Sequence, residues 1–535
     1  MNFDTSDQSF SITLGLSWVK PVVAWFKRYG GVIGLAIVLG ISIYYFAIYL
    51  GNGLGLSYND ARSHLDIGRR VVEGLKPGLA QLGSVWLPLN HLLMIPLIWQ
   101  DTLWHTGLAG AFWSMLAFVG TAVLITRYLK LLGVGWLGQL VGATIFIANL
   151  NVLYLQSTAM TELLLLFTML AGCYYLLHYH QTDNVLYLIK AAFWIMLSTL
   201  VRYDGWFLLG VAGLLVIRQS WVHKSFKQAE GTTILFSTLA AIGIIGWFVW
   251  NQLIFHDALY FILGPFSAHA QQKIMAAAGA LPTQGNMLLS LKVYLYALLY
   301  NVYTYPAILA IFGLVKFWLD RDLPRGSKWG IVALLSPLVF NIIALYLGFS
   351  VIYVQGISGD TWFNIRYGIM IIPLVAIAVG YLVDRARSYR LLLVLSLAMV
   401  LFFAFYSHDA VSIDDARVGS SQKNVSEVSG YLNTYAKNET GYILISAASH
   451  DAIIFSSGLP MKRFIHEGTG KYWDNATSYP DRFARWIVMR TYDDNDLTWK
   501  AVSQTEGFKY YHKVASYPFA DVYELDETHL DGLNK

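Results

Sequence analysis

The segment with the most chemically capable side chains is Tyr-Asn-Asp-Ala-Arg-Ser-His-Leu-Asp-Ile-Gly-Arg-Arg, residues 58–70. On a helix, Asp60 and His64 would share one face at i,i+4 spacing, as would Arg62 and Asp66. One interpretation is an interfacial amphipathic helix with a solvated, ion-paired face. The other makes Asp60 a general base that accepts a proton from an incoming hydroxyl, while cations nearby hold a phosphate.

Further ionisable residues occur next to apolar segments, where they are costly and often mark a site. These residues are Glu162, Arg202, Asp204, His256, His269, Lys273 and Arg366. Arg202 and Arg366 are candidates for phosphate binding, because the planar guanidinium matches phosphate oxygens.

Each of these residues also has a simpler interpretation. Arg366 could be a snorkelling interfacial arginine, and Arg202 could only pair with Asp204. Glu162 could hold a sugar hydroxyl or pair with Arg202. Lys273 could help to bind the phosphate, and His256 and His269 could assist, although ordinary loop residues are the simpler interpretation for all three.

The composition indicates a membrane protein that must position these residues. The chain of 535 residues is 56% hydrophobic and 13% charged, whereas soluble proteins carry about 25% charged residues. Its apolar blocks predict a polytopic α-helical protein with about eleven transmembrane helices. The predicted spans are 30–50, 107–127, 134–152, 160–178, 185–200, 205–217, 233–254, 304–319, 329–350, 366–383 and 391–406.

Charge predicts how these spans are oriented. Lys20, Lys27 and Arg28 precede the first span and place residues 1–29 in the cytoplasm. Segment 85–99 is apolar but short, and it contains two prolines. If this segment stays at the outer interface, within an outer loop 51–106, most later inner loops are basic, which favours that arrangement. The candidate residues then share the outer side of the plasma membrane.

The last part of the chain has a different character. Residues 407–535 hold 18 acidic and 13 basic side chains, a net charge of −5, against +9 for the remainder. The basic excess suits anionic lipid or phosphate, and no dense basic stripe points to nucleic acid. Strand-like runs alternate with helical segments, which predicts a small extracytoplasmic α/β domain. The runs are 442–446, 462–466, 486–490, 510–514 and 520–525, with helices near 424–437 and 496–506.

Five stretches carry a family resemblance that covers most of residues 30–406. They are residues 60–96, Thr-Ala-Met-Thr-Glu at 158–162, Val-Arg-Tyr-Asp-Gly at 201–205, Asp-Ala-Leu-Tyr-Phe with the nearby Gly-Pro-Phe-Ser at 257–267, and Asn-Ile-Arg-Tyr-Gly at 364–368. Together they resemble prokaryotic membrane glycosyltransferases of the GT-C superfamily, in the phospholipid-carrier-dependent group similar to the protein O-mannosyltransferases of family 39.

The resemblance implies an inverting hexosyl transfer from a polyprenyl-phosphate sugar to a hydroxyl of a glycan, lipid or protein acceptor. Asp60 matches the catalytic base proposed for this group. Many relatives have two adjacent acidic residues there, whereas this chain has Asp60-Ala61, so the role of the second carboxylate stays open, with Asp66 as a substitute. The remaining candidates, in sugar-binding, acceptor-binding or supporting roles, are Arg62, His64, Tyr203, Asp204 and Tyr367.

No obligatory metal is expected, because neither His256-Asp257 nor Asp60, His64 and Asp66 have a recognised ligand spacing. Mg²⁺ or Mn²⁺ stays a possible cofactor, since some GT-C enzymes need a divalent cation. Two rival functions are a transporter or flippase of lipid-linked sugars and a non-catalytic assembly subunit. A transporter often shows inverted repeats, and no repeat is visible here, while the presence of Asp60 argues against a non-catalytic subunit.

Overall fold

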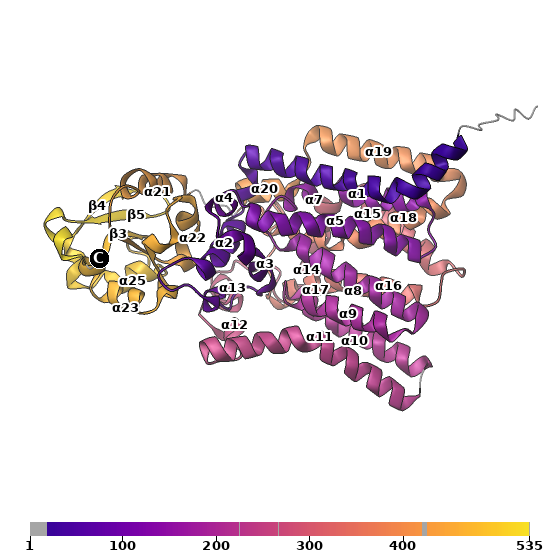
Figure 1. Cartoon of the computed structure of the whole chain (residues 1–535), viewed down its shortest axis with the longest axis horizontal. Helices are drawn as coiled ribbons and strands as arrows, with labels where there is room; N and C mark the ends of the chain where they lie inside the picture. Colours follow the sequence, from indigo (N-terminus) through magenta and orange to yellow (C-terminus); the bar gives the residue numbers. More distant parts are fainter. Residues whose placement is uncertain (1–18, 224, 266, 420–424, 534–535) are drawn as a thin grey trace, which may run out of the picture.

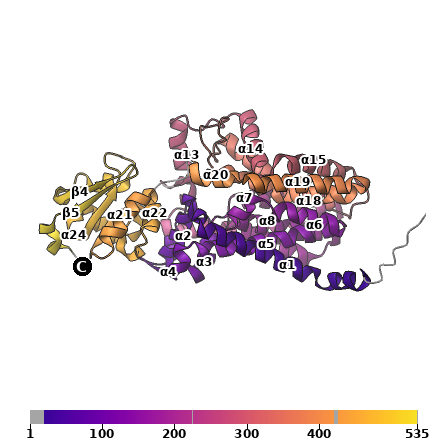
Figure 2. The ribbon, with the colours of Figure 1, turned by 90° about the horizontal axis from the view of Figure 1, so that it is seen from above.

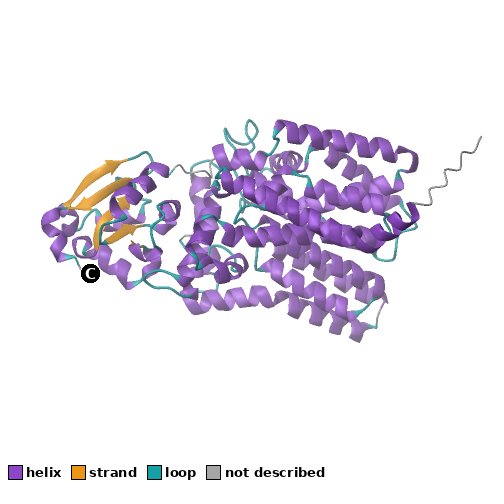
Figure 3. Ribbon diagram, turned by 45° about the horizontal axis from the view of Figure 1, so that its top comes forward, coloured by secondary structure: helices purple, strands orange, loops and turns teal. Residues whose placement is uncertain are grey.

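The structure is a computed structural model that describes residues 19–223, 225–265, 267–419 and 425–533. A long helical bundle carries a small domain at one end (Figure 1). The first described turns of the chain lie at the opposite end of this bundle, as Figure 2 also shows. The five strands found in the described part of the chain belong to the small domain (Figure 3).

Within the described residues, the bundle and the elements at its ends comprise twenty helices. In chain order they are α1 (Val19–Gly51), α2 (Asn59–Val72), α3 (Leu89–Ile98), α4 (Asp101–His105), α5 (Leu108–Leu131), α6 (Trp136–Ile147), α7 (Leu150–Leu155), α8 (Glu162–Thr182), α9 (Val185–Thr199), α10 (Asp204–His223), α11 (Phe226–Phe255), α12 (Tyr260–Leu263), α13 (Ala268–Ala277), α14 (Met287–Val302), α15 (Thr304–Leu319), α16 (Ser327–Leu334), α17 (Ser336–Leu347), α18 (Ile372–Arg385), α19 (Arg390–Ser407) and α20 (Val411–Val418). The 3-10 turns among them are η1 (Leu54–Leu56), η2 (Leu79–Leu82), η3 (Ile365–Ile371) and η4 (Arg387–Tyr389).

The chain is a multi-pass membrane protein, with fewer full-length spans than the sequence predicts. Among the described residues, eight helical stretches are long and apolar enough to cross a membrane, or nine if α14 and α15, bent by 106°, form one span. The predicted spans 134–152 and 185–200 correspond to the shorter helices α6 and α9, of 12 and 15 residues. At 1.5 Å per residue, helices of these lengths reach only about 18–23 Å.

The ambiguous segment 85–99 forms α3, which has ten residues. Such a helix is about 15 Å long, half of what a bilayer core requires. Helix α3 packs against α2 and α5, and the Leu89 amide donates to the Leu200 carbonyl at 3.0 Å. Segment 85–99 therefore stays at one end of the bundle, and the elements before and after it share that end.

The small domain is built on a five-stranded sheet in the order β2-β1-β3-β5-β4. The strands are β1 (Tyr442–Ile445), β2 (Phe464–Ile465), β3 (Ala484–Met489), β4 (Tyr511–Ser516) and β5 (Asp521–Leu525). Strand β1 is parallel to both β2 and β3, whereas β5 is antiparallel to β3 and β4. All five strands coincide with the runs predicted from the sequence, which confirms the predicted α/β character of this domain.

Helices cover this sheet. They are α21 (Ser426–Tyr431), α22 (Ala447–Ser456), α23 (Lys471–Ser478), α24 (Pro480–Phe483) and α25 (Leu497–Val502), with a π-helical turn η5 (Leu432–Ala436) and 3-10 turns η6 (Met461–Arg463), η7 (Glu467–Thr469), η8 (Glu506–Tyr510) and η9 (Glu527–Gly532). Among them, α22 contacts α2 of the helical body. The small domain is thus docked on the same end of the bundle as α2 and α3 (Figure 1).

One boundary differs from the sequence assignment, which gives residues 407–535 to the small domain. Helix α20 instead packs against α7, α14 and η3 of the helical body. The Ser412 hydroxyl donates to Asn151 Oδ1 at 2.8 Å, and the Tyr58 hydroxyl donates to the Ser412 carbonyl, also at 2.8 Å. Because α20 satisfies buried polar groups of the bundle, it belongs structurally to the membrane body.

Candidate active site

A cavity of about 300 Å³ opens at the end of the bundle that carries the small domain. It lies between α2, the segment before α3, the start of α10, α13, α17 and η3. Its charged and aromatic lining residues are Asp60, His64, Trp86, Arg202, Tyr203, Asp204, Phe340, Phe349, Phe363, Arg366 and Tyr367. Seven of these residues, all except Trp86 and the three phenylalanines, are candidates from the sequence.

Arg366 lies at the centre of the polar network, and only 1% of its side chain is exposed. Its Nη2 donates to Asp60 Oδ2 at 2.5 Å, its Nε donates to Glu162 Oε1 at 3.1 Å, and its Nη1 lies 3.6 Å from Asp415 Oδ2. The Tyr58 ring lies beneath the guanidinium at 4.6 Å. A buried guanidinium is stable only if such partners replace its hydration, which excludes the snorkelling interpretation of Arg366.

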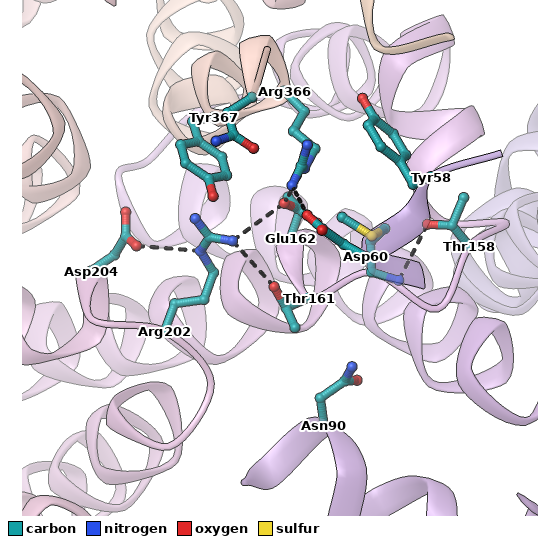
Figure 4. Close-up of polar contacts among 12 residues, drawn as sticks. Tyr58, Asp60, Asn90, Thr158, Thr161, Glu162, Arg202, Asp204, Arg366 and Tyr367 are labelled. Carbon is teal, nitrogen blue, oxygen red and sulfur yellow. Dashed lines mark hydrogen bonds and ion pairs between the residues drawn. The ribbon is translucent and has the colours of Figure 1, made fainter. Parts of the chain in front are cut away.

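Arg202 forms the second half of the network (Figure 4). Its Nη1 donates to Glu162 Oε1 and to Thr161 Oγ1, each at 3.3 Å, and its Nε donates to Asp204 Oδ2 at 3.4 Å. The Tyr367 ring lies 4.3 Å from its guanidinium carbon. Arg202 is 18% exposed. Both structural pairings predicted for Arg202, with Asp204 and with Glu162, are therefore present.

Glu162 joins the two arginines, because its Oε1 accepts a hydrogen bond from each. It is fully buried and lies beneath the cavity, outside its lining. Glu162, Asp60 and Asp204 all occupy the first turn of a helix, α8, α2 and α10 respectively. The N-terminus of a helix is a favourable place for an acidic side chain, so the position of each acid within its helix complements the arginines that it contacts.

His64 is buried beside the cavity, one helical turn after Asp60. Burial, together with the charges of Arg366 and Arg202, lowers its pKa to about 3. The imidazole is therefore neutral at physiological pH.

Several predicted residues lie elsewhere. Lys273 is exposed on α13, whose cavity-lining positions are Ala268, Gln271, Gln272 and Met275. His256 is an exposed residue at the C-terminus of α11, and His269 is half-buried with its ring 6.1 Å from that of Phe349. The structure does not bring these three side chains into the cavity.

Arg62 and Asp66 also lie outside the cavity lining. Arg62 Nε donates to the Leu56 carbonyl at 2.8 Å. Asp66 is buried, and burial raises its pKa well above the usual value, as does the neighbouring Asp451 of the small domain. Because Asp66 is buried and lies outside the cavity lining, it is a poor substitute for the second carboxylate.

The structure adds residues that the sequence analysis did not select. Asp415 of α20 is fully buried, pairs with Arg366, and accepts a hydrogen bond from the Tyr58 hydroxyl at 2.9 Å. Asn341 of α17 donates to Asp204 Oδ1 at 3.2 Å. The one sequence signal for Asp415 is its place just after the last long apolar block, where it was assigned to the small domain.

The network can bind a phosphate and deprotonate a hydroxyl in one cavity. Two guanidinium groups provide positive charge, and Asp60, 32% exposed, is a carboxylate that a substrate can reach. In the described part of the chain, no three His, Cys, Asp or Glu side chains form a group that could hold a metal ion.

Comparison with solved structures identifies the architecture. ArnT from Cupriavidus metallidurans, solved bound to undecaprenyl phosphate, is similar with a TM-score of 0.57 at 10% sequence identity, over 94% of this chain and 99% of that one. The chain has the GT-C fold. The archaeal oligosaccharyltransferase AglB from Archaeoglobus fulgidus, in complex with an inhibitory peptide and a dolichol-phosphate, is a weaker match, with a TM-score of 0.47 at 11% identity over 94% of this chain and 75% of that one.

No protein-family model and no curated protein sequence matches the chain. The GT-C assignment therefore rests on the arrangement of helices. The activity has to be argued from the cavity itself, because a fold carries many functions and the site decides among them.

Proposed function

We propose that the chain is an inverting membrane glycosyltransferase that moves a sugar from a polyprenyl-phosphate donor to an acceptor hydroxyl. One observation carries the proposal: a solvent-accessible carboxylate, Asp60, lies against the buried Arg366 in a cavity of a GT-C fold. ArnT, which shares this fold, was solved with undecaprenyl phosphate bound. This likeness favours the same class of lipid for the present chain.

The proposed step uses these groups as follows. The acceptor oxygen attacks the anomeric carbon from the face opposite the phosphate, and Asp60 takes the hydroxyl proton. The bond between the anomeric carbon and the phosphate oxygen breaks, and its electron pair leaves with the polyprenyl phosphate. Arg366 and Arg202 stabilise the charge on the departing phosphate, which is a good leaving group and needs no strong acid.

Phosphate binding must loosen the contact between Asp60 and Arg366, because that guanidinium now engages the carboxylate at 2.5 Å. Arg366 keeps Glu162 and Asp415 as partners when Asp60 turns away. We propose that the donor phosphate displaces Asp60 from Arg366 and frees it to act as a base. The two arginines supply the positive charge that the step demands, so we expect activity to persist in EDTA.

We also propose that the cavity faces the outside of the plasma membrane. The small domain lies at the cavity end, and the N-terminal end of α1 lies at the opposite end (Figure 2). In the sequence, this end of α1 holds the basic residues Lys20, Lys27 and Arg28. The positive-inside rule then places the N-terminus in the cytoplasm and the small domain outside. An acceptor glycan, lipid or protein would reach the cavity from the outer side.

The test uses the full chain in lipid nanodiscs. We expect it to bind undecaprenyl phosphate but not undecaprenol, and to transfer label from undecaprenyl-phosphate hexoses to acceptors in cell-envelope membranes. Full transfer activity in a folded Asp60→Asn variant would overturn the proposal. Proteoliposomes that move the lipid-linked sugar across the bilayer without covalent transfer would show a flippase instead.

A further inference from the structure

Two histidines from different helices meet beside the cavity and have no part in the proposed step. His64 Nδ1 on α2 and His91 Nε2 on α3 are 2.8 Å apart, a hydrogen bond between two neutral rings. His64 is 3% exposed and His91 is fully buried. His91 Nδ1 is itself buried, and the described residues give it no hydrogen-bond partner. His91 thus fixes His64 and does not reach the cavity.

The pair leaves one ring nitrogen for a ligand. His64 lines the cavity and Trp86 lines it beside His64, with the two rings 4.4 Å apart. Because His91 engages Nδ1 of His64, Nε2 is the nitrogen left to meet a ligand. If His64 donates to His91, this Nε2 accepts a hydrogen bond, and if His91 donates, Nε2 carries the proton and donates. A sugar hydroxyl can satisfy either state, since it both donates and accepts.

The charges around this pair restrict the sugar. Burial lowers the pKa of both imidazoles, so neither ring is a cation at neutral pH. Among the described residues that line the cavity, the cations are Arg202 and Arg366, which the proposed function assigns to the phosphate. Asp60 and Asp204 line the same space and would repel a second anion.

Resting on the proposed function, we infer that His64, oriented by His91, binds a hydroxyl of the donor sugar, and that this sugar carries no acidic group. His64 lies one turn from Asp60 on the same face of α2, and Arg366 contacts Asp60, so a sugar between the phosphate and the base meets both His64 and Trp86. His64 is a binding residue in this scheme, and His91 is a positioning residue.

The experiment distinguishes the contribution of the sugar to binding from that of the phosphate, by using lipids that differ only in the sugar they carry. Dissociation constants are measured for the full chain in nanodiscs by native mass spectrometry. The probes are undecaprenyl phosphate and its glucose, mannose, galactose, arabinose and galacturonic acid derivatives. We expect at least one uncharged sugar to bind more tightly than the bare lipid phosphate, and the galacturonic acid derivative to bind no tighter than it.

Substitutions at His64 then test the hydrogen bond. A His64→Asn side chain can keep the contact with His91 but cannot reach into the cavity, whereas His64→Gln places an amide near the position of Nε2. We expect His64→Asn to weaken the tightest sugar lipid about 5- to 10-fold, as for one lost hydrogen bond, without changing the affinity for bare undecaprenyl phosphate. His64→Gln should recover part of the loss.

The control is His512→Gln, an exposed histidine on β4 that pairs with Asp526 at 2.8 Å. It should leave all affinities unchanged, and melting temperatures check that each variant folds. The inference is overturned if no uncharged sugar lipid binds more tightly than the bare phosphate, if the galacturonic acid derivative binds more tightly than the bare phosphate, or if His64→Asn affects both lipids equally. Failure of the wild type to bind bare undecaprenyl phosphate would instead count against the proposed function.

Discussion

Helix α2 presents two polar faces, each with an aspartate, and the two faces have different surroundings. On one face, Asp60 and His64 line the cavity. On the other, the Ser63 hydroxyl donates to Asp451 of the small domain, and Asp66 interacts electrostatically with that same carboxylate. One face therefore meets a cavity that a substrate can enter, and the other meets a protein surface.

We call the face of α2 that meets the small domain the docked face. Farther along it, Arg70 interacts electrostatically with His466 and Glu467 of the small domain. Nearby, the Gln81 amide donates to the Gly468 carbonyl at 2.8 Å. Residues 466–468 thus meet α2 and η2, and none of the three lines the cavity. The difference between the two faces shows that the role of a charged residue on α2 depends on what packs against it. Burial against protein disfavours the charged form of a side chain, whereas a side chain that lines an open cavity can stay solvated and charged.

The strongest test of this comparison exchanges one carboxylate for an amide on each face. Asp60→Asn removes the proposed base with little change of shape. We expect kcat for sugar transfer to fall about 100- to 10,000-fold, since general bases contribute on this order. The measurement is label transfer from the preferred undecaprenyl-phosphate sugar.

The matched change is Asp66→Asn, on the docked face of the same helix. Burial raises the pKa of Asp66 well above its usual value, which favours the neutral carboxyl form that an amide resembles in shape and charge. We expect activity within about 3-fold of the wild type and an unchanged or slightly higher melting temperature. A large loss of activity here would contradict the division between the two faces.

The next largest effect concerns the arginines that face Asp60. Lysine keeps the charge but cannot form the planar fork, so Arg366→Lys should weaken undecaprenyl phosphate binding about 10- to 100-fold and lower the melting temperature. Arg202→Lys should weaken binding with less loss of stability, because Arg202 is 18% exposed and Arg366 is 1% exposed. Equal melting temperatures for the two variants would contradict a structural role of Arg366 as the partner of three carboxylates, Asp60, Glu162 and Asp415.

A smaller effect is expected on the docked face. Ser63→Ala removes the hydrogen bond to Asp451 and should lower the free energy of unfolding by about 1 kcal/mol. Transfer activity should stay near that of the wild type, because the hydroxyl does not line the cavity. Thermal unfolding of the purified protein measures the first quantity and label transfer the second.

The effect that is smallest at neutral pH, and that grows only as the pH drops, is the contribution of His466 to stability; burial and Arg70 lower the pKa of His466 to about 3. In the unfolded chain the His466 imidazole takes up a proton as the pH drops below about 6.5, whereas in the folded chain it stays neutral. The free energy of unfolding therefore falls as the pH drops below about 6.5. At pH 5.0 the loss from this residue is about 2 kcal/mol at most. Between pH 7.5 and 5.0, the melting temperature of the His466→Gln variant should fall by less than that of the wild type. An identical loss would contradict burial of a neutral His466.

Local patterns were enough to predict part of this structure. The five strands of the small domain were predicted because each is a short, hydrophobic run between turn residues. Helix α22 was not predicted, because Ala447–Ser456 is largely apolar and shows no amphipathic period that would separate it from a buried strand. The membrane blocks were recognisable by hydropathy alone, whereas the shorter α6 and α9 show that apolar length in sequence is an imperfect guide to helix length.

The sequence by itself determined that the chain crosses a membrane many times, and that Asp60 and His64 lie on one face of a helix, because both properties depend on neighbours within a few residues. Only the tertiary structure decided which partners they have. Asp60 and Arg366 are 306 residues apart in the chain, and the buried guanidinium needed several carboxylates from separate helices to compensate its charge. Asp415 and His91 acquired their places in this way, through packing that no local pattern encodes.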